Sequence, residues 1–291
     1  MRKWKLSCMS SLQYSQMSPE KVVASLARVG YEAVEWTLNH YDPRKHTPAE
    51  RKHLVEVTRN AGLDVSEFVV QIDCMRLDEA VRRDRIAFCL ECIEAAAECG
   101  ASTLNFFTGP APWFKDAPVV GRDIGMGTAW QMTYDAFDQF VAAAEKHNVY
   151  IAVEQCFGHL CHDFYTLSRL VEHYSSPHLG VNYDPSHDAL AGNWDTYWVT
   201  KQWGSRIRHM HLKDGVGEPR EGSFLFTMFG EGHVDWTGLF TALDEIGYAR
   251  YCSLEYESFA YYRQVLHEDM EAAARLSREQ LFELLKPVYG G

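Results

Sequence analysis

Four residues with metal-binding side chains lie at or near the ends of four successive apolar runs. Glu154 closes YIAVE, Asp184 closes LGVNYD, His211 lies in IRHMHLK and Glu255 lies in YCSLEYE. One such residue alone is more often a surface charge or a satisfied buried group, because burying a carboxylate without a partner is costly. Four of them in matching positions, three carboxylates and one imidazole, predict a divalent-metal site. This ligand set favours Mn²⁺, and also Co²⁺, Mg²⁺ or Fe²⁺, over a thiolate-rich structural zinc site.

The elements that must position these residues are short β-rich runs that alternate with longer helical patterns. Strictly alternating units of this kind imply parallel strands joined by helical crossovers. Eight units within 291 residues imply one closed (β/α)₈ barrel that spans residues 1–291 as a single catalytic domain. The alternative is a doubly wound open sheet, which usually has a Gly-rich phosphate loop after its first strand, and SCMSSLQYSQ is not one. The predicted strands are 4–9, 32–36, 64–69, 102–107, 150–155, 179–184, 207–213 and 251–257.

The helical segments between these strands begin and end with typical capping residues. The segment 19–30 starts with Pro19 and ends at Gly30, and a second segment, 47–62, repeats this pattern. Two long segments, 108–128 and 214–235, follow strands and are predicted to lie as loops on the C-terminal face of the barrel, where long loops are usually functional and often act as lids. The other predicted helices are 78–100, 133–149, 235–247 and 267–287.

Composition restricts the class of protein. A hydrophobic fraction of 46% with 23% charged residues is typical of a globular domain, and a formal net charge of −12 disfavours nucleic acid as a partner. No run approaches the roughly 18 to 20 apolar residues of a membrane span, and the N-terminus has no small-residue cleavage site. We therefore expect a cytoplasmic protein with a small-molecule substrate and no membrane contact. The long loops are compatible with a homo-oligomer.

The eight cysteines are expected to be reduced thiols, because they are scattered and no export signal precedes them. Cys89 and Cys92 form a CxxC motif. The surrounding AFCLECIEAAAECG has helical periodicity, so we interpret both as buried helix residues and not as a redox or zinc site.

Together these residues resemble the xylose isomerase-like TIM-barrel superfamily of sugar isomerases and epimerases, which includes ketose 3-epimerases and inosose dehydratase. The likeness spans nearly the whole chain. The motifs that carry it are VEQ with Glu154, NYDPSH with Asp184 and His187, HMHLKD with His211, LEYE with Glu255, VEW with Glu35, and GEGHVDW at 230–236.

The resemblance implies that Glu154, Asp184, His211 and Glu255 are the metal ligands and that His187 contacts the substrate. In the epimerase branch, the two ligating glutamates also form the acid–base pair. The bound ion would polarise the substrate carbonyl, while one carboxylate removes the proton next to that carbonyl and another returns it.

The chain departs from the ketose 3-epimerases at two positions. Leu160 stands where those enzymes have a sugar-binding glutamate, and Gly217 stands where they have an arginine. His159 and His162, in the unusual FGHLCH segment, are therefore candidates for a histidine acid or base. Such a group would suit the lyase relatives, including inosose dehydratase and enzymes that eliminate from 3-keto-glycosides.

Four further residues are candidates for substrate contact. Glu35 lies at the C-terminal end of its predicted strand, and Lys213 follows the predicted histidine ligand; each is otherwise a surface charge or part of a loop ion pair. Phe106 and Trp113 could stack on a sugar ring or close the top of the barrel.

Two enzyme classes thus remain open, and we favour a sugar isomerase or epimerase over a lyase. The lyase would use the same proton abstraction and expel a β leaving group from a keto-inositol or a 3-keto-glycoside. A nuclease of the endonuclease IV type would need three zinc ions and extra histidines after strands 2 to 4, where this chain reads VEWTLN, EFVVQID and NFFTGP. A non-catalytic barrel would not need the full ligand set.

Overall fold

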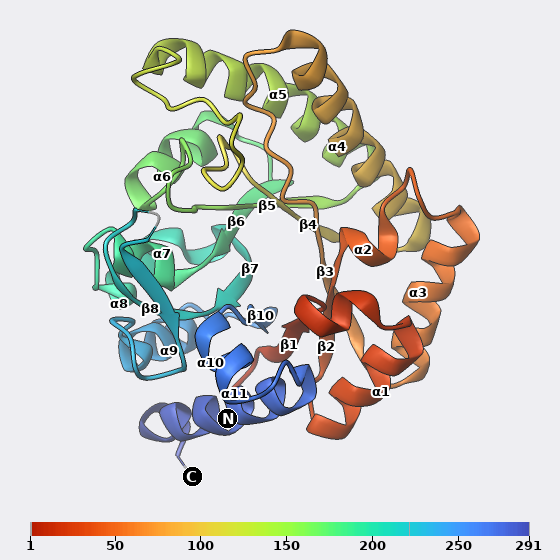
Figure 1. The fold of residues 1–291 in the computed structure, drawn as a ribbon, viewed down its shortest axis with the longest axis vertical. Coiled ribbons are helices and arrows are strands. Elements are labelled where there is room, and N and C mark those ends of the chain that lie inside the picture. The colour runs from red at the N-terminus through yellow and green to blue at the C-terminus, as the bar shows by residue number, and fades with distance from the viewer. Residues whose placement is uncertain (1, 221, 291) are drawn as a thin grey trace.

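Eight parallel strands close into a barrel in the computed structural model, which describes residues 2–220 and 222–290. The order around the ring is β1-β10-β7-β6-β5-β4-β3-β2, so the predicted (β/α)₈ barrel is confirmed (Figure 1). Every predicted strand is present, and the longest discrepancy at an end is three residues, after β10. The strands are β1 (Lys5–Met9), β2 (Ala33–Thr37), β3 (Asp64–Val69), β4 (Thr103–Phe106), β5 (Tyr150–Glu154), β6 (Leu179–Tyr183), β7 (Ile207–Leu212) and β10 (Tyr251–Leu254).

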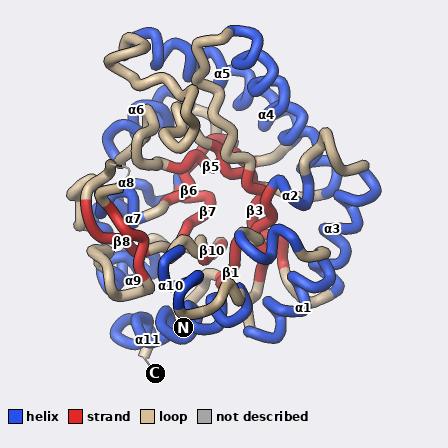
Figure 2. Tube along the Cα trace, viewed as in Figure 1, coloured by secondary structure: helices blue, strands red, loops and turns tan. Residues whose placement is uncertain are grey.

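Helices surround this ring of strands (Figure 2). The predicted caps are present: Thr47 and Glu50 form a capping box at the start of α3, and Gly30 ends α1 with a φ of 94° that suits glycine. The α-helices are α1 (Pro19–Val29), α2 (Leu38–Tyr41), α3 (Pro48–Asn60), α4 (Glu79–Cys99), α5 (Met126–His147), α6 (Phe164–His173), α7 (Pro185–Leu190), α8 (Thr196–Trp203), α9 (Trp236–Glu245), α10 (Phe259–Gln264) and α11 (Met270–Tyr289), with short 3₁₀ helices at Leu12–Gln16 and Gly204–Arg206.

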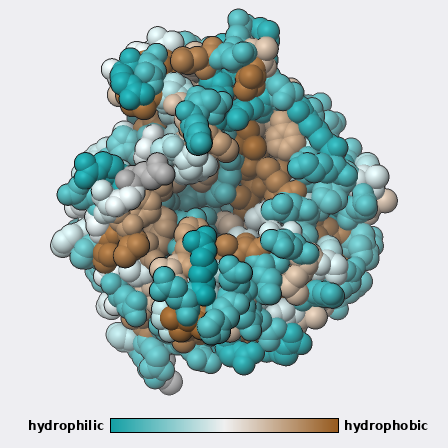
Figure 3. Space-filling view, in the orientation of Figure 1, coloured by the Kyte–Doolittle hydropathy of each residue, from teal (hydrophilic) through white to brown (hydrophobic). Residues whose placement is uncertain are grey.

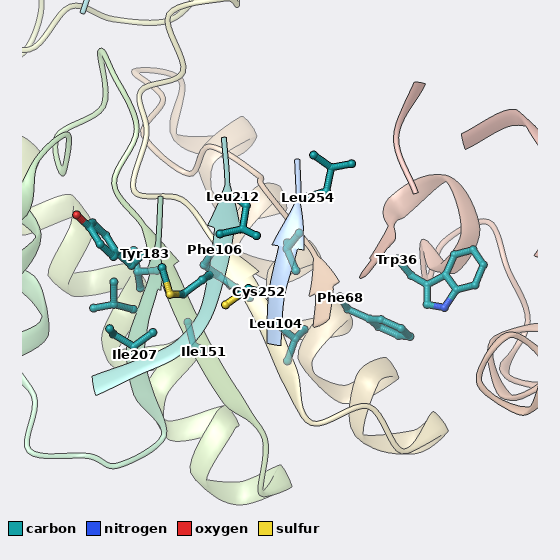
Figure 4. Close-up of a cluster of buried hydrophobic side chains, with 14 of the residues drawn as sticks. Trp36, Phe68, Leu104, Phe106, Ile151, Tyr183, Ile207, Leu212, Cys252 and Leu254 are labelled. Carbon is teal, nitrogen blue, oxygen red and sulfur yellow. The ribbon is translucent and has the colours of Figure 1, made fainter. Parts of the chain in front are cut away.

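The barrel strands alternate between an apolar outer face and a polar inner face. Outward side chains pack against the helices, as Phe106 does on Phe140 of α5 with 5.2 Å between ring centroids. Figure 4 shows Phe106 among other buried apolar side chains of the strands, such as Leu104 and Ile151. Inward side chains are polar and fully buried, and neighbours in the register include Glu35 beside Glu67 and Ser253 beside His211. Since buried polar groups need partners, this inner face is where a hydrogen-bonded or metal-bound network must form.

Two long segments lie at the ends of the strands, as predicted, but one is not a plain loop. Residues 214–235 contain an antiparallel hairpin of β8 (Asp214–Gly217) and β9 (Phe224–Thr227), which the sequence prediction missed. The other segment joins β4 to α5 and is held by Asp73, whose carboxylate accepts hydrogen bonds from the amides of Met75 and Ala111.

All eight cysteines are free and buried, and Cys89 and Cys92 lie inside α4, as expected. Within residues 2–220 and 222–290, no helix is both long and apolar enough to cross a membrane.

Candidate metal centre

The four predicted ligands converge at the C-terminal ends of four barrel strands. Glu154 ends β5, Asp184 directly follows β6, His211 lies in β7 and Glu255 directly follows β10. One ligand atom from each residue lies within 4.8 Å of the others, and all four side chains are buried. The barrel thus brings together residues that are up to 101 positions apart in the chain (154 to 255).

The chemistry of this donor set fits a divalent cation. Nδ1 of His211 lies 3.0 Å from Oε1 of Glu154 and 3.3 Å from Oε2 of Glu255. Burial, followed by the nearby charge of Glu255, raises the pKa of Glu154 to about 7. Three buried carboxylates this close together require positive charge nearby, and a divalent ion held by the four side chains would supply it.

Lys213 provides part of that positive charge. Its Nζ lies 2.5 Å from Oε2 of Glu255 and 3.0 Å from both Oδ2 of Asp184 and Oε2 of Glu257. Although burial opposes it, the charges of Asp184 and Glu255 hold the pKa of Lys213 well above its ordinary value. Lys213 therefore lies within the centre and contacts two of the expected ligands.

Asp214 fixes the loop that follows Lys213. It does not pair with Lys213; instead its carboxylate accepts hydrogen bonds from the amides of Gly230, Gly232 and Val234 and from Nε1 of Trp236. A Cβ at Gly232 would overlap the Asp214 carboxylate, so this position requires glycine. The GEGHVDW motif is thus the backbone cradle of Asp214, which orients the neighbouring Lys213.

Glu35 lies beneath the centre and not in the substrate cavity described below. It is fully buried, and its Oε1 lies 2.8 Å from Nε2 of His211, on the opposite side of the ring from Glu154 and Glu255. The expected direct contact of Glu35 with substrate is therefore not what the geometry supports. Glu67 and His209 lie next to it, 3.1 Å apart, as a further buried pair. We expect Glu35 to orient the imidazole ligand and increase its basicity.

The first prediction tests this positioning role. Glu35→Gln should weaken metal binding by about 10- to 100-fold, because partners of this kind tune ligand geometry and basicity. Titration of metal-free protein with Mn²⁺ or Co²⁺ gives the affinity. Glu67→Gln is the matched control, since Glu67 is equally buried but contacts His209 in place of His211. Equal affinity in the wild type and Glu35→Gln would exclude the role.

A cavity of about 880 Å³ opens above the centre. Its floor is polar and includes Glu154, His187, Lys213, Glu255 and Glu257. Its walls are mostly apolar and come from the β4–α5 segment, the β8–β9 hairpin and the start of α10. A smaller lobe of about 360 Å³ adjoins it at Gln71, Glu255, Glu257 and Phe259, with neutral polar groups from the β1–α1 and β2–α3 segments.

Three of the predicted substrate contacts line this cavity, Lys213 on its floor together with His187 and Trp113. His187 points its Nε2 toward the centre, 3.5 Å from Oδ2 of Asp184, and Trp113 forms part of a wall. Phe106 does not line it, contrary to expectation, because the last residue of β4 points outward onto α5. The next residue, Phe107, occupies the wall instead. The sequence interpretation also missed Glu257, although its spacing of two from Glu255 gives it the same strand parity.

Neither His159 nor His162 lines the cavity, so the expected acid–base role is not supported by their positions. The turn after β5 folds back, with the amide of Leu160 bonded to the carbonyl oxygen of Gly109. The ring of His159 is buried between Phe107 and Trp113, and burial lowers its pKa to about 3. His162 is exposed, with Nδ1 3.0 Å from the carbonyl oxygen of His159.

The second prediction concerns these two histidines. We expect His162→Ala to keep turnover within about threefold of wild type, as for an ordinary surface change. His159→Phe keeps an aromatic ring between Phe107 and Trp113 but removes both nitrogens, so it too should remain active. Steady-state turnover of metal-loaded variants is the measurement. A fall of about 10² or more in either variant, with metal content intact, would restore a catalytic histidine.

Comparisons with known proteins agree with this fold. The family model described as "Xylose isomerase-like TIM barrel" matches residues 23–281. A putative L-ribulose-5-phosphate 3-epimerase from Escherichia coli (strain K12) is 26% identical over 241 residues, covering 79% of this chain and 80% of that protein. An inosose dehydratase from Geobacillus thermodenitrificans is 28% identical over 159 residues, which are 50% of this chain and 51% of that protein. This chain therefore matches about half the length of that dehydratase.

Among solved structures, the IolI protein with a bound zinc atom has a similar fold. It superposes with a TM-score of 0.78 at 17% identity and covers 99% of this chain and 100% of that one.

Proposed function

Because this chain belongs to the xylose isomerase-like TIM-barrel family, we propose that it is a divalent-metal-dependent isomerase or epimerase of a sugar or keto-sugar. The reaction would begin with removal of the proton next to the substrate carbonyl. The observation that carries this proposal is the convergence of Glu154, Asp184, His211 and Glu255 beneath an open cavity. Since β1 pairs with β10 to close the ring, we treat residues 1–291 as one catalytic unit.

Each residue of the centre has a role in this proposal. A divalent ion held by the four ligands would polarise the carbonyl and stabilise the negative charge that develops on it. Glu154 and Glu255 reach the cavity floor from different strands, so one can remove a proton and the other can return it. His187 and Lys213 would hold substrate oxygens.

A lyase is the second candidate, and the group formed by Lys213 and Glu257 favours it. Expelling a β leaving group requires a proton donor near the departing oxygen, in addition to the base. Burial raises the pKa of Glu257, which makes its carboxyl group the proton donor of the pair, and Nζ of Lys213 lies 3.0 Å from its Oε2; both residues line the cavity beside Glu255. The partial similarity to inosose dehydratase supports the same class of reaction.

One experiment separates the two candidates. The Mn²⁺-loaded enzyme is incubated in D₂O with a panel of keto-sugars, keto-inositols and 3-keto-glycosides, and products are analysed by mass spectrometry and NMR. Deuterium incorporation without loss of a group supports isomerisation or epimerisation. Loss of water or of an aglycone supports the lyase. If no panel member exchanges a proton or loses a group, while His211→Ala behaves identically to the wild type, the proposal fails.

The third prediction concerns the metal requirement. Chelation should abolish proton exchange, and Mn²⁺ or Co²⁺ should restore it. Protons on Glu154, whose pKa is about 7, and on His211, whose pKa the surrounding carboxylates raise well above its ordinary value despite burial, both compete with the ion. The apparent metal affinity should therefore fall by at least about tenfold per pH unit below pH 7. Metal titrations between pH 5 and 8 measure this slope. Full activity after exhaustive chelation would rule the requirement out.

A further inference from the structure

The cavity above the metal centre is larger and more apolar than a free sugar requires. At about 880 Å³ it has room for roughly 30 water-sized groups, whereas a hexose has about a dozen non-hydrogen atoms. A sugar in contact with Glu154, Glu255 and Lys213 would therefore leave more than half of the cavity unfilled. The unfilled part is the outer one, away from the charged floor.

This outer part, the apolar chamber, is built from Phe107, Trp113, Phe157, Phe224, Leu225 and Phe259. Neighbouring aromatic rings of this chamber are in contact with one another. The centroids of Trp113 and Phe157 are 6.0 Å apart, and those of Phe157 and Phe224 are 4.6 Å apart. Phe157 comes from the turn after β5 and Phe224 from the β8–β9 hairpin, so separate loops contribute to one continuous wall.

Several walls of the apolar chamber remain exposed to solvent. Trp113 is 46% exposed and Leu225 is 62% exposed, and both line the cavity. The space-filling view shows a central hollow with hydrophobic surface on its border, including over the β8–β9 hairpin (Figure 3). Large apolar side chains gathered around a concave site indicate that they contact a bound apolar group.

The charges around the cavity argue against an anionic substrate. Among the described residues that line its two lobes, Lys213 is the one cationic side chain, and three carboxylates already pair with it. The lining also includes Glu231 and Glu257 in addition to the expected ligands. A phosphate group would meet these carboxylates with no arginine to pair with it.

We propose that the substrate is an unphosphorylated sugar joined to an aromatic group, with the sugar over the metal centre and the aromatic group in the apolar chamber. The flat rings of Trp113, Phe157 and Phe224 offer stacking partners for such a group. The smaller lobe, lined by Ser11, Ser15, Thr37 and Asn39, offers neutral hydrogen-bonding groups for sugar hydroxyls. The position of the sugar rests on the proposed function, whereas the binding of the aromatic group is inferred from the residues that line the apolar chamber.

Binding, measured by calorimetry without turnover, tests this assignment. The ligands are 4-nitrophenyl β-D-glucoside, methyl β-D-glucoside and glucose 6-phosphate, together with 2-naphthol, whose binding does not depend on sugar stereochemistry. The nitrophenyl glycoside should bind about 10- to 100-fold more tightly than the methyl glycoside, because a buried aromatic ring contributes that much. 2-Naphthol should compete with it, and glucose 6-phosphate should bind no more tightly than the methyl glycoside.

Matched variants locate the effect in the chamber. Trp113→Ala and Phe224→Ala should each reduce the nitrophenyl preference by at least about fivefold, in line with the loss of one ring contact. Tyr165→Ala is the control, since Tyr165 is an exposed aromatic residue of α6 outside the cavity. Equal binding of the two glycosides, no binding of 2-naphthol, or tighter binding of glucose 6-phosphate would overturn the proposal.

The same titration in His211→Ala separates this proposal from the proposed function. The aromatic preference should persist in that variant, because none of the chamber residues contacts the imidazole. If the aromatic preference is present but no substrate exchanges protons in D₂O, the assignment of the apolar chamber is supported and the proposed reaction is contradicted. If proton exchange occurs without an aromatic preference, the proposed reaction is supported and the assignment of the apolar chamber is contradicted.

Discussion

Replacing His211 with alanine is expected to remove bound metal and lower turnover by at least about 10³-fold, since metal catalysis contributes several kcal/mol to stabilising the transition state. His211 is the single nitrogen ligand of the set, and its Nδ1 faces both Glu154 and Glu255. Without the imidazole, three carboxylates remain with Lys213 as their main positive partner. The centre then has one ligand too few and a buried gap beside Glu35.

Metal content by mass spectrometry, turnover and circular dichroism are measured together on this variant. Glu154→Gln, which keeps the size of the side chain but removes its charge, should also lose metal and activity. His53→Ala is the control, because His53 is an exposed histidine of α3 that pairs only with Glu20 in the described structure. Wild-type metal content in both His211→Ala and Glu154→Gln, with the barrel still folded, would disprove the site.

Much of the fold could be predicted from the sequence because barrel strands leave a strong pattern. Their outer faces are covered by helices, so they appear as short apolar runs between capped helices. The convergence of the candidate ligands could be predicted for a related reason: a charged residue at the end of an apolar run, such as Glu154 or Asp184, has to be explained by a partner. These signals are local, and local signals survive in a single sequence.

The parts that could not be predicted depend on contacts between distant segments. Whether Phe106 or Phe107 faces the cavity is decided by where β4 ends, and a shift of one residue reverses the side. His159 lies behind the cavity wall because the turn after β5 folds back, with Leu160 bonded to Gly109, 51 residues earlier. The predicted helix 133–149 begins later than α5, which starts at Met126, because Gly127 weakens the helical pattern of the first turn.

Depth within the barrel is a further quantity that strand patterns do not give. Glu35 and Glu154 both occupy inward positions of apolar strands, and the sequence treats them alike. In the structure Glu154 reaches the cavity floor, whereas Glu35 lies one level lower against the far side of the His211 ring. The same pattern therefore yields one expected ligand and one residue that positions a ligand.

Lys213→Met should lower turnover by about 10² to 10⁴ while leaving metal binding intact or tighter. The ammonium group pairs with Asp184 and Glu255, so it competes with a cation for the same oxygens. Removing it frees two ligands for the metal and leaves Glu257 without its partner. It also removes the one cationic group that the described cavity lining offers to a substrate oxygen or a leaving group.

Metal titration and single-turnover kinetics on the same preparation separate a catalytic role from a structural one. A residue that only stabilises the centre would lower metal affinity and the melting temperature when replaced. A residue that acts on the substrate lowers turnover in fully metal-loaded protein. Lys201→Met is the matched control, because Lys201 is a half-exposed lysine of α8 paired with Glu245, away from the cavity. Wild-type turnover in metal-loaded Lys213→Met would leave Glu154 and Glu255 as the acid–base groups without help from the lysine, and would weaken the case for a lyase, which needs the additional proton donor.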